Sequence, residues 1–242
     1  MKHNGPLLDL AGNPTEKYKT HGIPGAIVEF DRLFPLDLSS FASAEAQVAA
    51  IADDIAYNAH DIDDGLRAGL FSVRDLREAP FLAEIADKLA FLWPDIDMSH
   101  LGYEIVRRVI TIFVEDVIGE AERRLVRLKP ACAADIRAAQ HAVVTFSAAM
   151  AEAARPIKGF LYPRMYRHPQ VMRIRADAGQ IVHDLFDRYL AEPGLMPEEW
   201  QRDLGDDPAR RARRVADYIA GMTDRYAVDA HRRLFDATPA LR

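Results

Sequence analysis

Apolar residues recur at three- and four-residue steps through most of the chain, from about residue 43 onward. In the first such segment they are Val48, Ala52, Ile55, Ala59, Ile62 and Leu66. This spacing places the apolar side chains on one face of a helix, whereas a half-buried strand would alternate at every second residue. Ser43 is a good N-cap for this helix, which we expect to end at about 65–69. The periodicity therefore predicts an all-α fold.

Proline and glycine residues divide the remaining helical pattern. Ser72 and Asp75 have the spacing of a capping box, so we expect a short helix that stops before Pro80. A second short helix should end at Trp93-Pro94. The later predicted helices are 99–129, 133–154, 169–191 and 207–236. Because these helices differ in length and connection, we expect an irregular multi-helix domain rather than a short-looped bundle.

The first 42 residues differ from the rest because glycine and proline are closely spaced there. Such spacing prevents a long regular element, and residues 26–30 form the only plausible strand. We therefore expect a loop-rich N-terminal segment, 1–42, and a helical part, 43–242.

Composition excludes several classes of protein. The chain has 242 residues, of which 49% are hydrophobic, and this is enough apolar material for a core. No apolar run approaches the roughly 18 residues that a membrane span needs, and the N-terminus lacks the pattern of a secretory signal. The single cysteine, Cys132, excludes a disulfide framework and fits a cytoplasmic protein. We expect Cys132 to be a small buried hydrophobic residue.

The formal net charge of −6 conceals two poles of opposite sign. Five aspartates and no Lys or Arg lie between Asp53 and Asp64, whereas six Lys or Arg and no acidic residue lie between Arg155 and Arg175. If folding brings these segments together, one could hold a cation and the other a polyanion. The alternative is two helix faces exposed to solvent.

Within the acidic segment, helical geometry places Asp53, Tyr57, Asp61 and Asp64 together, opposite the apolar stripe, with His60 at the edge. A solvated face would explain the charges alone. However, Asp is a poor helix former, and an aromatic ring among charges needs a partner. Both observations fit a face that is covered by something polar and cationic.

Four sequence segments, in this order, resemble the HD-domain deoxynucleoside triphosphate triphosphohydrolases, the dGTPase-like family. They are KHNGP at 2–6, ADDIAY at 52–57 with His60-Asp61 and Asp64 beyond it, KGFLYPRMYRHP at 158–169, and DYIAGMTD at 217–224. The resemblance implies the C-terminal part of an HD-domain phosphohydrolase-type fold. It also implies a metal-dependent hydrolase that converts a dNTP and water to a deoxynucleoside and triphosphate, and that forms a homo-oligomer.

The resemblance assigns roles to individual residues. Family members hold a divalent metal, Mg or Mn, through a His, a His-Asp pair and a final Asp, and the last corresponds to Asp53, the catalytic residue. The positions that correspond to substrate-binding residues are Tyr57 beside the nucleotide, Asp61 at the sugar hydroxyl, Lys158 and Arg164 at the phosphates, Tyr166 at the deoxyribose, and His168. Triphosphate needs several cations, which the basic segment can supply.

The family's metal-binding His and His-Asp pair precede the KHNGP segment, and here that segment follows Met1 directly. We therefore expect a fragment, a gene read from an internal start, or a degenerate relative. His60 cannot replace the missing ligands, because it lies two turns, about 10 Å, from Asp53 along one helix. His183-Asp184 has the same dipeptide, but its apolar surroundings argue against a metal role.

Two alternatives to the hydrolase remain. The chain could be a non-catalytic nucleotide-binding or assembly module of the same family, since the upstream ligands are missing. It could also bind single-stranded nucleic acid weakly, because Phe160, Tyr162 and Tyr166 alternate with basic residues in the segment 155–175, and such aromatics can stack on bases. The net negative charge disfavours the second alternative.

Overall fold

The computed structural model describes residues 5–202, 204–205 and 207–235. The regular secondary structure of this part is helical, and its one β-type pairing is an isolated bridge between Leu8 and Pro14. The predicted all-α class is therefore confirmed. Among the described helices, none has the length and apolarity that crossing a membrane requires.

The chain divides into two compact units, Met1–Met165 and Tyr166–Arg242. The expected boundary between residues 42 and 43 stays a prediction.

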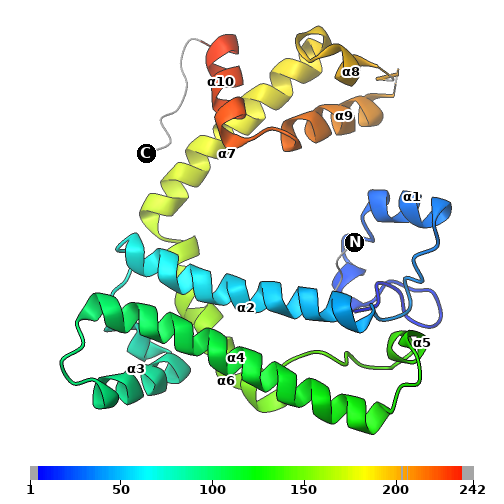
Figure 1. The fold of residues 1–242 in the computed structure, drawn as a ribbon. Coiled ribbons are helices and arrows are strands. Elements are labelled where there is room, and N and C mark those ends of the chain that lie inside the picture. The colour runs from blue at the N-terminus through cyan, green and yellow to red at the C-terminus, as the bar shows by residue number, and fades with distance from the viewer. Residues whose placement is uncertain (1–4, 203, 206, 236–242) are drawn as a thin grey trace. The chain divides into compact units, whose positions relative to one another are not determined.

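Two long helices, α2 (Ala44–Arg67) and α4 (Met98–Leu128), run antiparallel and side by side in the first unit (Figure 1). The Ser43 side chain caps α2 by accepting a hydrogen bond from the backbone, as the sequence predicts. Asp97 caps α4 in the same way. Phe113, at the middle of α4, is fully buried. This helix pair forms the centre of the unit.

The rest of the helical packing in this unit comes from α3 (Pro80–Leu92), α6 (Ala148–Leu161) and the 3-10 turn η2 (Asp75–Glu78). The backbone N and the Oγ of Ser72 both donate to Asp75 Oδ2, at 2.7 and 2.8 Å. The predicted capping interaction is therefore present, although it opens a 3-10 turn rather than an α-helix.

The expected strand at 26–30 is wrong, because these residues lie in α1 (Gly25–Leu33). Periodicity cannot distinguish a helix from a strand over so short an apolar run. A short 3-10 turn, η1 (Glu16–Tyr18), precedes it.

The expected helix at 133–154 is also wrong. The chain forms α5 (Ala133–Arg137), then an irregular connection, and α6 begins only after Ser147, which caps it. Cys132 is exposed at the N-cap of α5, a short helix that buries none of its residues. The expectation that Cys132 is buried was therefore incorrect.

In the second unit, α7 (Pro169–Ala191) has the predicted bounds and packs against α9 (Pro208–Ala220) and α10 (Asp224–Leu234). The expected single helix at 207–236 is interrupted because Thr223 caps a new helix, α10. Two short elements, η4 (Pro193–Leu195) and α8 (Glu198–Gln201), connect α7 to α9.

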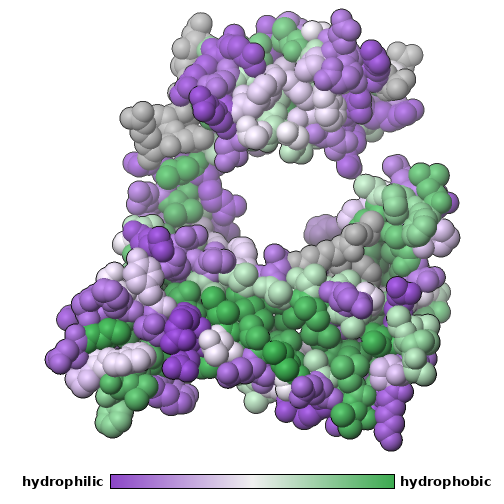
Figure 2. All heavy atoms as spheres, viewed as in Figure 1, coloured by the Kyte–Doolittle hydropathy of each residue, from purple (hydrophilic) through white to green (hydrophobic). Residues whose placement is uncertain are grey.

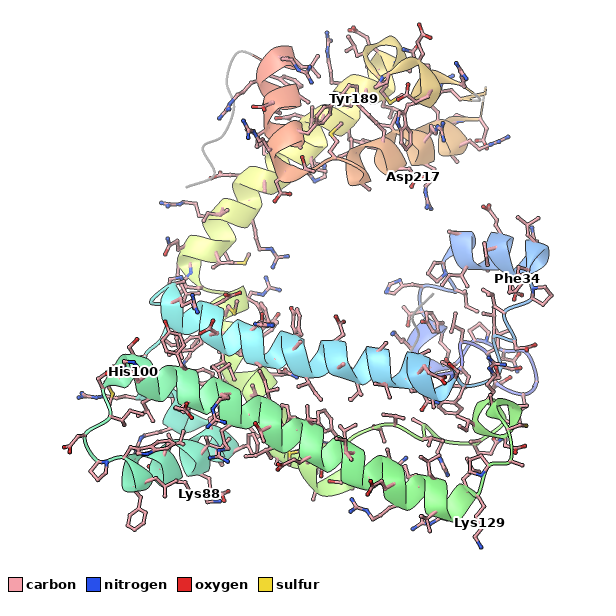
Figure 3. The ribbon with its side chains drawn as sticks, viewed as in Figure 1. Phe34, Lys88, His100, Lys129, Tyr189 and Asp217 are labelled. Carbon is pink, nitrogen blue, oxygen red and sulfur yellow. The ribbon has the colours of Figure 1, made fainter. Side chains whose placement is uncertain are left out.

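These helices of the second unit enclose a separate core. Its buried members are Ile181, Leu185, Tyr189, Met196, Val215, Tyr218, Ile219 and Ala230. Tyr189 lies inside the helix cluster, whereas Asp217 lies on the outside of α9 (Figure 3). Burial raises the pKa of the Tyr189 and Tyr218 hydroxyls, so both side chains remain neutral in the core.

Candidate functional site

Four polar side chains follow one another along the outward face of α2. They are Asp53, Tyr57, His60 and Asp64, and all of them are exposed. Tyr57 is 57% exposed, so an aromatic ring stands in solvent among acidic residues, as the sequence predicts. We call these four residues the polar ridge.

Asp61 does not belong to the polar ridge. It is only 8% exposed and lies on the buried face of α2, together with Asn58 and Gly65. Because α2 packs against both α4 and α6, a wider arc of the helix is buried than one apolar stripe indicates. The prediction that Asp61 shares the outward face with Asp53 was therefore wrong.

An aromatic contact fixes the basic motif against the end of α2. The rings of Phe71 and Phe160 meet edge to face, with 5.0 Å between their centroids. A Cβ atom at Gly65 would lie 2.2 Å from the Phe71 ring, so this approach requires glycine there. Phe160 is buried, so its ring is part of the core of this unit.

The two predicted phosphate contacts of the first unit differ in their surroundings. Lys158 is exposed on α6, whereas Arg164 forms an ion pair with Glu78. The Arg164 guanidinium also lies 4.5 Å from the centroid of the Phe160 ring. Since an exposed ion pair contributes only about 0–1 kcal/mol, a bound phosphate could replace Glu78 as the partner of Arg164.

The opposite charges of the sequence partly come together in this unit. The helix that carries Lys158, α6, packs against α2, which carries Asp53. The acidic pole and the first part of the basic pole are therefore on neighbouring helices.

Tyr166 and His168 belong to the second unit. Tyr166 is half-buried at the end of a π-helical segment, η3 (Tyr162–Tyr166), that continues α6. Such segments are rare and are frequent at functional sites. His168 stands at the N-cap of α7, and its Nδ1 is buried without a hydrogen-bond partner among the described residues.

The described residues do not complete a metal site. Among them, no three His, Cys, Asp or Glu side chains are close enough to hold one ion. Asp53 offers a single hard carboxylate ligand. Asp184, beside the exposed His183, accepts a hydrogen bond from His231 Nε2 at 3.0 Å, which explains that dipeptide structurally. In the motif at 2–6, residues 2–4 lie outside the described residues.

The connection between α5 and α6 is held by Gln47, which sequence analysis did not single out. Gln47 is buried on α2, and its Oε1 accepts hydrogen bonds from the backbone N of Val143 at 2.8 Å and of Val144 at 3.0 Å. Its Nε2 donates to the carbonyl of Ala42 at 2.8 Å. The partners are 96 and 97 residues apart, so no local pattern could have indicated them.

Two side chains of α4 hold the same connection. Asp116 accepts hydrogen bonds from the backbone N and the Oγ of Ser147, at 2.8 and 2.6 Å. Arg124 donates to the carbonyl of Ala142 at 2.7 Å. The connection is therefore attached to both long helices and covers their shared end.

A hollow of about 680 Å³ lies where α2 ends and α4 begins. Asp63, Arg67 and Tyr103 contribute its polar and aromatic lining. It contains none of the predicted site residues, so it is distinct from the polar ridge.

Comparisons with known proteins agree with the sequence motifs. The family model of the phosphohydrolase-associated domain matches residues 144–233. The chain is 50% identical, over its whole length, to a "Deoxyguanosinetriphosphate triphosphohydrolase-like protein" of Rhodopseudomonas palustris (strain BisB18), and covers 61% of that relative. It is 49% identical to the protein of that name from Bradyrhizobium diazoefficiens, of which it covers 60%. It is 52% identical to the protein of the same name from Rhizobium etli (strain CIAT 652), of which it covers 59%.

The chain is a homologue of these dGTPase-like proteins. The predicted resemblance is thereby confirmed over all of the sequence. The chain spans about three fifths of the length of the dGTPase-like relatives that it matches.

Proposed function

We propose that this chain supplies substrate-binding and metal-binding residues to a dNTP triphosphohydrolase, which converts a dNTP and water to a deoxynucleoside and triphosphate. The observation that supports this most is the identity of about 50% over the whole chain with relatives named deoxyguanosinetriphosphate triphosphohydrolase-like. The same resemblance supports a homo-oligomer in the cytoplasm.

On the polar ridge, we assign Asp53 as the catalytic and metal-binding residue and Tyr57 as a nucleotide contact. Both side chains are exposed one turn apart on a rigid helix, so a ligand can reach both. Mg²⁺ or Mn²⁺ prefers carboxylate oxygen, and when bound it would polarise a phosphoryl oxygen. The described residues do not complete the ligand set of such a metal.

The phosphates are assigned to Lys158 and Arg164. Lys158 is exposed on the helix that packs against α2, and Arg164 is held by its stacking on Phe160. Two cations six residues apart, one on α6 and one on η3, suit a triphosphate, because each can take a different phosphate oxygen.

We assign Asp61, Tyr166 and His168 to the nucleoside by family resemblance. The buried position of Asp61 gives it a fixed orientation, which hydrogen bonding to a sugar hydroxyl requires. The buried Nδ1 of His168 has no partner among the described residues, so a ligand group could satisfy it.

The test is release of inorganic triphosphate from each dNTP by the purified protein with Mg²⁺ or Mn²⁺. Asp53→Ala should abolish the release, whereas Asp64→Ala, a carboxylate on the same ridge without an assigned role, should change the rate less than about twofold. Unchanged turnover in Asp53→Ala would show that the assignment is wrong.

The second candidate is a non-catalytic nucleotide-binding module. The observation that favours it is that the described residues do not complete a metal site. Calorimetric titration of the chain with a dNTP and Mn²⁺ separates the two candidates. Stoichiometric binding without turnover would favour the module, and binding with turnover would favour the hydrolase.

A further inference from the structure

A carboxylate from another element occupies one of the two proposed phosphate contacts. The chain has no acidic residue between Arg155 and Arg175, so an acidic partner for Arg164 must come from outside this segment. Glu78 in η2 is that partner, and its ion pair with Arg164 Nη2 joins residues that are 86 positions apart. Lys158 differs, because no described residue forms an ion pair with it. One of the two proposed cations is therefore already neutralised, and the other is open.

Arg164 does not need Glu78 to keep its position. Its guanidinium lies 4.5 Å from the centroid of the Phe160 ring, and Phe160 is only 5% exposed. The Phe160 ring is held in turn by its edge-to-face contact with Phe71. A guanidinium that lies over a ring face still has the N–H donors of its edge for an acceptor. Stacking therefore holds the cation, and Glu78 occupies donors that a ligand could use.

Glu78 can leave this contact more easily than the neighbouring carboxylate of η2. The Glu78 side chain is 57% exposed, so water can solvate it when the ion pair opens. Figure 2 shows hydrophobic residues over the middle of α2 and α4, and hydrophilic residues over the end of α2. Asp75 also interacts electrostatically with Arg164, but its Oδ2 accepts two hydrogen bonds from Ser72. The exchangeable carboxylate is therefore that of Glu78.

A phosphate group would compete with Glu78 for the same donors. Phosphate and carboxylate both accept hydrogen bonds from the fork of N–H groups on a guanidinium. A triphosphate carries several negative charges, so a Glu78 carboxylate that stayed beside it would repel it. The ligand must therefore displace Glu78 before it can use Arg164 fully.

We propose that Glu78 is an internal competitor of the triphosphate. It occupies Arg164 while the site is empty, is displaced when the triphosphate group of a dNTP binds, and thereby weakens that binding. This inference rests on the proposed function, because Arg164 is assigned there as a phosphate contact.

Calorimetric titration of the chain with inorganic triphosphate, without metal, tests the competition. Glu78→Gln should lower the Kd by at least about threefold, since the ligand no longer has to break an ion pair. Glu84→Gln is the matched control, because it removes the same charge from an exposed carboxylate that pairs with Lys88 on its own helix. It should change the Kd by less than about 1.5-fold.

Double variants distinguish competition at Arg164 from a general effect of charge or folding. Arg164→Ala should weaken triphosphate binding and should abolish the effect of adding Glu78→Gln. Lys158→Ala should also weaken binding but should leave the effect of Glu78→Gln intact, because Lys158 forms no ion pair with Glu78. As a spectroscopic readout, the side-chain N–H signal of Arg164 in nitrogen-15 NMR should shift both on Glu78→Gln alone and when triphosphate is added to the wild type.

The possible outcomes separate this proposal from the proposed function. If the chain does not bind triphosphate, or if Arg164→Ala leaves binding unchanged, the assignment of Arg164 to the phosphates fails together with the proposal. If Arg164→Ala weakens binding but Glu78→Gln does not strengthen it, only the role of Glu78 is overturned. An equal effect of Glu78→Gln with and without Arg164 would overturn that role as well.

Discussion

Replacing Gln47 by leucine should detach the connection between α5 and α6 from α2. The substitution conserves most of the side-chain volume and removes three hydrogen bonds at once. Two of these satisfy the backbone N–H groups of Val143 and Val144, and Val143 is fully buried. Since the connection contains no regular secondary structure, its N–H groups depend on side-chain acceptors.

The expected decrease in the free energy of unfolding follows from the two backbone N–H groups that lose their acceptor. A buried donor without a partner costs about 1–3 kcal/mol. Two such donors, partly relieved by local rearrangement and by the apolar leucine, should lower the free energy of unfolding by about 3 kcal/mol. For a unit of this size, that corresponds to a decrease of roughly 6–12 °C in the melting temperature.

Urea unfolding followed by circular dichroism measures the loss, and hydrogen exchange locates it at the amides of Val143 and Val144. Gln140→Leu is the control, because Gln140 is exposed and donates only to the carbonyl of Ala138 at 3.3 Å. Gln140→Leu should lower the free energy of unfolding by less than about 0.5 kcal/mol. Equal effects of the two substitutions, or unchanged protection of both amides in Gln47→Leu, would refute the reasoning.

Two further predictions concern local contacts. The Ser147 hydroxyl caps α6 by accepting a hydrogen bond from the backbone N of Met150 at 3.1 Å, and it also donates a hydrogen bond to Asp116. Ser147→Ala should therefore lower the free energy of unfolding, measured in urea, by about 1–2 kcal/mol. An unchanged free energy of unfolding would contradict the capping role. The hydrogen bond from His231 lowers the pKa of Asp184, so this stabilisation is present above the unfolded carboxyl pKa of about 3.9 and is lost as the pH falls through the lower folded pKa. Asp184→Asn should therefore lower the melting temperature at pH 7, and this decrease should become smaller as the pH falls below about 3.9. A decrease that stays the same at every pH would argue against this linkage.

Local patterns predicted the elements that are long or clearly capped. Ser43 and Pro169 begin helices where expected, because capping and proline chemistry act within one turn. The same reasoning failed at 133–154, where a helical pattern is broken by hydrogen bonds to Gln47 and Asp116. Those partners lie on other helices, and tertiary contacts override local propensity.

In the candidate site, too, local spacing predicted the positions of some residues and tertiary packing decided those of others. Asp53 and Tyr57 are on the outward face that the spacing indicates, whereas Asp61 is buried, because α2 packs against α6 as well as α4 and a wider arc of the helix is covered than the apolar stripe indicates. The family motifs suggested roles for all three residues, and the position of α6 could not be inferred from them. The ion pair of Arg164 with Glu78 likewise joins residues that are 86 positions apart.

The sequence alone established the all-α class, the acidic and basic poles, and the resemblance to the dGTPase-like proteins. These properties depend on residue order over short distances, which periodicity and motifs record directly. The assembled fold established which face of α2 is buried and how the connection between α5 and α6 is attached. These depend on packing between segments far apart in the chain, and the free energy of that packing is set by neighbours that no local pattern identifies.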